Sequence, residues 1–153
     1  AELRKEGSDT LEFTPKINLK IPILIPETYI DDSSLRLAIY RRTGLLKNND
    51  DIENFKLEME DRFGPVPNEF LNLLKVVEIR NKCMEHKIEA LDSGPEGFVI
   101  KFNENFDVSE KVMNFVQKYP RNAKIKPDNK LVYLKKLNQD NLIDEANQFL
   151  AEL

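Results

Sequence analysis

The side chains of this sequence that could take part in a reaction are few, and they form no complete catalytic set. Cys83 and His86 would be neighbours on a helix, because residues three apart lie on the same face. Cys83, however, falls among apolar residues, and a histidine near a helix C-terminus interacts favourably with the helix dipole. We therefore interpret both as structural. A single Cys and a single His also leave no ordinary zinc site.

Two further patterns could bind a ligand. Glu27, Asp31 and Asp32 could hold a hard cation through carboxylate oxygens, which leaves a small metal-dependent hydrolase as one alternative. Asp31 and Asp32 directly precede a predicted helix, however, where capping acids are expected in any case. A phosphate cradle needs closely spaced glycines at a strand-to-helix turn. The nearest candidate, Gly-Pro-Glu-Gly at 94–97, lies between two predicted strands and is typical of a hairpin.

Arg36, Arg41 and Arg42 form the only basic patch that the sequence suggests. Arginine clusters bind phosphate or acidic partners, so a module that binds nucleic acid or RNA polymerase through these residues is a second alternative. The next predicted helix is rich in Asp and Glu, and the arginines can pair with it across the helix hairpin. We favour internal pairing.

One surface is better suited to a protein contact. In the predicted helix 51–63, Leu57 lies nearly opposite the apolar side, and Asn54, Glu58 and Asp61 surround it. A small apolar centre ringed by acids suits an interface, because the centre is desolvated on binding and the charges select the partner. The other interpretation is a lone surface leucine, which is common.

The composition fits a globular domain without a strong nucleic-acid signature. Charged residues make up 33% and apolar residues 41% of the 153 residues, and the net charge is −4. An acidic balance argues against a duplex-binding surface, because phosphate binding relies on an excess of Lys and Arg. No apolar run is long enough to span a bilayer, so no membrane contact is expected. One Cys permits no internal disulfide, which favours a reducing compartment, the cytoplasm.

The first half of the chain predicts one strand and three helices. Residues 17–26 alternate apolar and polar positions, and Pro22 confines such a strand to a sheet edge because it lacks a ladder donor. Apolar spacing then predicts helices over 29–46, 51–63 and 68–87. The last helix carries two adjoining apolar rows, so more than one of its sides should be covered.

In the second half of the chain, apolar residues recur at the two-residue period of β-strands. Turn residues predict two hairpins, and Val112, Met113 and Val116 should face inward from a helix. The predicted strands are 88–92, 98–102, 123–126 and 131–134, and the predicted helices are 108–119 and 142–153. The fold class is therefore α+β: a helical half of three helices, and a small, mostly antiparallel sheet with an edge strand and packed helices.

Three segments together resemble the C-terminal domain of the bacterial transcription-repair coupling factors. They are Ile-Pro-Ile-Leu-Ile-Pro at 21–26, the run 29–42 with its Tyr-Arg-Arg end, and Asp-Arg-Phe-Gly-Pro-Val-Pro at 61–67. The resemblance covers 17–153, which we take as one regulatory domain. Residues 1–16 resemble the connection from preceding motor domains, and the start at Ala1 rather than Met suggests an excised piece.

The resemblance implies a place in a large ATP-driven, helicase-like DNA translocase that removes stalled RNA polymerase and recruits nucleotide-excision repair. The ATP and magnesium sites, the hydrolase activity and the DNA-gripping motifs of such a protein lie in other domains. This domain is accordingly expected to be no enzyme, to hold no cofactor and to bind no DNA directly.

The resemblance also implies a partner. In this family the terminal domain resembles an autoinhibitory clamp that docks on the UvrB-like N-terminal module of the same protein and hides the surface that recruits UvrA. UvrA and RNA polymerase would thus be indirect partners. The expected contact residues are Asn54, Leu57, Glu58 and Asp61, and Arg62 at the end of the same helix.

Overall fold

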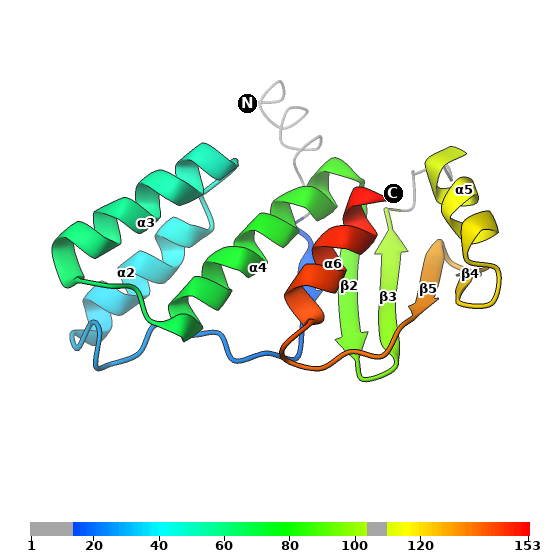
Figure 1. Ribbon diagram of the computed structural model, residues 1–153. Helices are drawn as coiled ribbons and strands as arrows, with labels where there is room; N and C mark the ends of the chain where they lie inside the picture. Colours follow the sequence, from blue (N-terminus) through cyan, green and yellow to red (C-terminus); the bar gives the residue numbers. More distant parts are fainter. Residues whose placement is uncertain (1–13, 104–109) are drawn as a thin grey trace, which may run out of the picture.

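The computed structural model describes residues 14–103 and 110–153, which form a helical half and a sheet half side by side (Figure 1). This arrangement confirms the predicted α+β class. The elements, in chain order, are β1 (Lys16–Asn18), α2 (Ser33–Thr43), α3 (Asn49–Phe63), α4 (Asn68–Glu85), β2 (Ile88–Gly94), β3 (Gly97–Phe102), α5 (Glu110–Lys118), β4 (Ala123–Lys126), β5 (Lys130–Leu134) and α6 (Leu142–Ala151). No described helix combines the length and the hydropathy needed to cross a membrane.

The five strands form one sheet in the order β1-β2-β3-β5-β4. All neighbours are antiparallel except β1 and β2, which are parallel. The edge position of β1 is confirmed, but its predicted extent of 17–26 is wrong. The strand ends at Asn18 because the chain then turns away, and the Leu24 amide donates to the Glu69 carbonyl of α4 at 3.3 Å. The alternation instead carries Leu19 into one core and Ile25 into the other.

The helical half begins with two capped helices. The Asp32 carboxylate accepts from the Ser34 and Leu35 amides and caps α2, which confirms the capping interpretation. Helix α3 starts two residues before the predicted start, because Asn48 serves as its N-cap. It ends at Phe63, and the φ of +94° at its C-cap residue, Gly64, suits a residue without a Cβ.

Helix α4 lies between the two halves and belongs to both cores, as its two apolar rows predict. Phe70, Leu74 and Val77 join the core of the helical half, whereas Ile79 and Cys83 join the core of the sheet half. All five side chains are less than 5% exposed. The two halves are therefore parts of one packed unit.

Helices α5 and α6 pack with α4 on one face of the sheet (Figure 1). Phe115 of α5 contacts Tyr133 of β5 and Phe149 of α6, with ring centroids 5.0 and 5.2 Å apart. The prediction that Met113 faces inward is wrong, since Met113 is 41% exposed and Phe115 takes the inward position. The predicted start of this helix at 108 lies outside the described residues.

Candidate functional site

The sequence-predicted contact residues lie together on one side of α3. Asn54, Leu57, Asp61 and Arg62 are exposed, and Glu58 is partly exposed between them. We call these five residues the acidic face of α3. The opposite side of the helix buries Phe55 and Met59, and this burial fixes which way the face points.

Glu58 is held by two arginines of the same chain. Its Oε2 and Oε1 accept from Nη1 and Nη2 of Arg42 at 2.6 and 2.7 Å, and Oε2 also accepts from Nη1 of Arg62 at 3.1 Å. This bidentate geometry is the strong form of a charge-assisted pair. The hydrogen bonds from Arg42, together with the one from Arg62, lower the pKa of Glu58 from 4.5 to about 2.

Asp61 and Leu57 differ from Glu58 in having no such engagement. Among the described residues, no cation lies within ion-pair distance of the Asp61 carboxylate. Leu57 is 52% exposed. An unpaired acid and an uncovered leucine one turn apart on a helix are therefore available to another molecule.

A hollow continues the acidic face of α3 towards the end of α2. It has a volume of about 330 Å³ and is lined by Arg42, Leu45, Leu46, Asp51, Asn54, Phe55 and Glu58. Leu45, on its rim, is 72% exposed. The exposure of Leu45 could not be predicted from the sequence. Leu45 lies in the connection that follows α2, where no helical periodicity separates a buried from an exposed position.

The Glu58 network leads to a prediction on pH. Because the folded-state pKa of Glu58 is depressed, the stability that the Arg42 pair adds is fully present above pH 4.5 and is lost as the pH falls towards 2. The variant Glu58→Gln should thus be less stable than the parent chain by less than about 1 kcal/mol at neutral pH, and equal to it near pH 2.

Chemical denaturation at several pH values measures that difference, and a carboxyl NMR titration of Glu58 measures the pKa itself. The variant Arg42→Met serves as a control, because it should bring the Glu58 midpoint back towards its ordinary value. A titration midpoint near 4.5 in the unmodified chain would contradict the bidentate pairing.

The three arginines of the predicted basic patch do not form one surface. Arg42 binds Glu58 across the helix hairpin, which confirms internal pairing for this residue. Arg36 donates to the Ile30 and Asp31 carbonyls at 2.9 and 3.1 Å and lies 3.8 Å from Glu27. Only Arg41 is left exposed, in the last turn of α2.

The other candidate reaction groups have structural surroundings. Cys83 is fully buried, and this burial raises the pKa of its thiol to about 12. His86 is the C-cap residue of α4, and burial lowers its pKa. Residues 94–97 form the tight turn of the β2–β3 hairpin. Within residues 14–103 and 110–153, no group of three His, Cys, Asp or Glu side chains could hold a metal ion.

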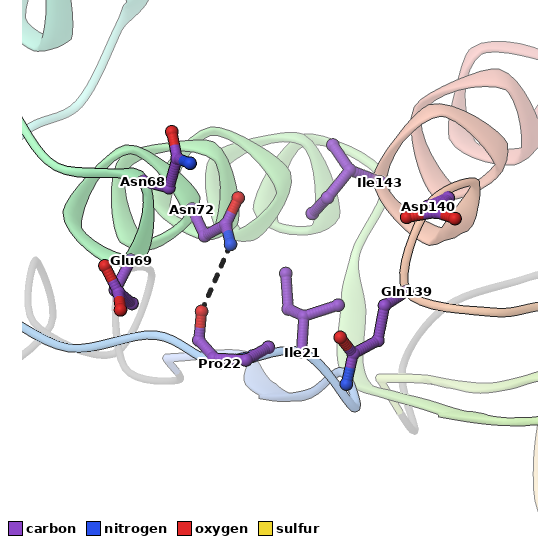
Figure 2. A pocket seen from close by; sticks show the side chains of 8 residues that line it. All are labelled: Ile21, Pro22, Asn68, Glu69, Asn72, Gln139, Asp140 and Ile143. Atoms are coloured by element: carbon purple, nitrogen blue, oxygen red, sulfur yellow. Dashed lines mark hydrogen bonds between the residues drawn. The ribbon is translucent and has the colours of Figure 1, made fainter.

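Figure 2 shows a groove between the β1–α2 connection, the start of α4 and the segment that leads into α6. Ile21 and Ile143 give it an aliphatic side, and the Asn72 amide donates to the Pro22 carbonyl at 3.2 Å. Its volume is about 290 Å³, and its remaining lining residues are Asn68, Glu69, Gln139 and Asp140. Since these offer carboxylates and amides but no cation, the groove cannot neutralise a phosphate.

Comparisons with known proteins agree on one group. A family model described as the TRCF domain matches residues 19–113. The transcription-repair-coupling factor of Rickettsia prowazekii (strain Madrid E) is 50% identical over 153 residues, which cover 99% of this chain and 14% of that protein. That of Rickettsia conorii (strain ATCC VR-613 / Malish 7) is 53% identical over 141 residues, 92% of this chain and 13% of that protein.

A solved structure has the same fold. It is described as the crystal structure of the C-terminal domain of transcription-repair coupling factor, and it matches with a TM-score of 0.65 at 19% identity. The match covers 92% of this chain and 95% of that one. By contrast, the chain spans only 13–14% of the two Rickettsia proteins.

Proposed function

Because this chain belongs to the TRCF domain family, we propose that it is a regulatory domain of a transcription-repair coupling factor and docks through the acidic face of α3. The partner is the UvrB-like N-terminal module of the same protein, and docking hides the surface that recruits UvrA. The main support for this proposal is that Asp61 is an exposed carboxylate without an ion-pair partner among the described residues. It lies one turn from the uncovered Leu57.

In this proposal the two acids of the face have different roles. Glu58 is already satisfied by Arg42 and Arg62, so a basic group of the partner gains little from it. Its role is to hold Arg62 in place beside the contact. Asp61 then meets the partner's cation, and Leu57 is buried against an apolar side chain.

Such a contact suits a reversible clamp. A modest, acid-rimmed interface can open when another part of the protein stabilises the open state by a few kcal/mol. We propose that engagement of RNA polymerase by the motor opens the clamp, so that UvrA is recruited only at a stalled polymerase. In this proposal the chain performs no reaction, and ATP hydrolysis and DNA translocation belong to other domains.

Binding in trans tests this function. The chain, added to the isolated N-terminal module, should form a complex and should displace UvrA in proportion to its concentration. Calorimetry measures the first property and a competition pull-down the second. The proposal fails if the chain and UvrA occupy the module together.

The nucleic-acid alternative through Arg36, Arg41 and Arg42 receives less support, because two of the three guanidiniums are engaged within the chain. It predicts salt-sensitive binding to duplex DNA that Arg41→Glu abolishes. We expect no salt-sensitive DNA binding, and therefore no loss of it in Arg41→Glu. Electrophoretic mobility shift assays at two salt concentrations would measure the binding.

A further inference from the structure

The second face of the sheet is not covered by any described element. Helices α4, α5 and α6 pack on the face that carries the buried residues of each strand. The alternate positions, including Val99, Val132 and Leu134, point the other way, and Val99 and Leu134 are 37% and 46% exposed. We call this surface the open face of the sheet.

Strand register places four lysines in one row across the open face of the sheet. Lys101 of β3 pairs with Lys130 of β5, and Lys130 pairs with Lys126 of β4. On the other side, Lys101 and Lys16 of β1 both pair with Ala90 of β2. The neighbouring pair on the same face is Val99 with Val132, and the exposed Asp92 and Lys124 flank this pair on the adjacent strands.

This row has an energetic cost in the isolated chain. Like charges directly opposite each other on neighbouring strands destabilise a sheet. Glu89 lies 3.4 Å from Lys101 and offsets part of the repulsion, but the described residues place no acid within ion-pair distance of Lys126 or Lys130. A local arrangement that opposes stability is expected where a surface serves another purpose. It also concentrates positive charge on a chain whose net charge is −4.

We propose that the open face of the sheet is a second binding surface and that its occupant is an acidic amphipathic helix of another polypeptide. A sheet face is commonly covered by a helix, which here would bury Val99, Val132 and Leu134. Acidic side chains along one edge of that helix would pair with the lysine row. Four strand spacings of about 4.8 Å make the sheet about 19 Å wide, so roughly 13 helical residues span it.

The composition of the surface favours a protein over a nucleic acid. Single strands are bound by aromatic side chains on which bases stack, and the exposed positions of the strands carry none. Phosphate recognition would use the lysines alone and leave the aliphatic centre uncovered. An acidic helix uses both parts of the surface.

The experiment uses a fluorescent peptide of 18 residues that carries Leu at positions i, i+4, i+7 and i+11 and Glu along one edge of that stripe. Fluorescence anisotropy should show saturable binding to the chain that weakens with salt. The double variant Lys126→Glu/Lys130→Glu should weaken this binding at least tenfold. The matched variant Lys75→Glu/Lys136→Glu alters net charge equally at exposed positions elsewhere and should change it less than twofold.

Three outcomes would overturn the proposal: no saturable binding, equal binding of a scrambled peptide of the same composition, or a 20-base-pair duplex that binds more tightly through the same lysines. The acidic face of α3 is not involved, so Leu57→Asp should leave peptide binding unchanged. Failure here is therefore distinguishable from failure of the proposed clamp.

A single variant tests the same idea through stability. Lys130→Glu places an acid between Lys101 and Lys126, so it should raise the melting temperature by roughly 1 to 4 °C while weakening peptide binding. Calorimetry and anisotropy on one sample measure the two effects. A lysine row that serves only solubility would give the gain in stability without the loss of binding.

Discussion

The variant Leu57→Asp is expected to bind the UvrB-like module about 30- to 150-fold more weakly than the unmodified chain. The substitution removes the apolar centre of the acidic face of α3 and places a second carboxylate beside Asp61. The lost desolvated contact and the buried charge together account for about 2 to 3 kcal/mol. In the whole coupling factor, the same change should increase UvrA binding, which a pull-down of the full-length protein measures.

The matched control is Leu37→Asp on α2. Leu37 is 50% exposed and Leu57 is 52% exposed, so the two variants carry similar costs in the isolated chain. Leu37 lies outside the acidic face of α3, and its variant should bind the module normally. Equal weakening by both variants would mean that the face is wrongly located.

The charge at Asp61 can be examined in the same assay. Asp61→Arg should slow association and reduce its salt dependence, because exposed charges act mainly on the rate of encounter. Glu85→Arg is a suitable comparison, since Glu85 is also exposed in the last turn of a helix. Surface plasmon resonance at two salt concentrations measures both rates.

The variant Gly97→Ala should produce the largest loss of stability, about 2 to 4 kcal/mol in the free energy of unfolding. A Cβ at this position would lie 2.2 Å from the Tyr133 carbonyl oxygen and 2.9 Å from the Leu134 Cα. Gly97 also has a φ of +145°, which side-chain-bearing residues rarely adopt. Thermal unfolding should show a fall of roughly 5 to 12 °C in melting temperature.

Gly94 provides the control from the opposite strand. It pairs directly with Gly97, yet a Cβ there would meet no atom within 4 Å. Gly94→Ala should change the free energy of unfolding by less than about 1 kcal/mol. Similar losses in the two variants would show that the close approach of β3 to β5 is not what requires glycine.

Much of the fold could be predicted because its elements carry strong local signals. Helix α4 has two apolar rows between Pro67 and Glu85, and both hairpins have turn residues at their tips. The length of β1 could not be predicted in this way. Alternation reports burial on two sides, and a segment that passes from one core to another alternates as a strand does.

The candidate site was predictable in position but not in its electrostatics. The position of Leu57 follows from helical period alone. The pairing of Glu58 with Arg42 depends on how α2 packs against α3. The spacing gives only a hint of it: each residue lies eight positions from Asp50, and an antiparallel hairpin brings residues at equal distances from its turn together. The lysine row was less accessible still, because it requires the register of five strands, and no short sequence pattern contains that information.

Helix α4 has a consequence for binding at both proposed surfaces. This 18-residue helix buries side chains in each core, so the acidic face of α3 and the open face of the sheet are held at a fixed separation and orientation. A bivalent partner whose two contact elements match that spacing would gain avidity, because the second contact forms at a high effective concentration. A partner with a different spacing would bind only one surface at a time. The rigid helix therefore selects bivalent partners by the spacing of their contact elements.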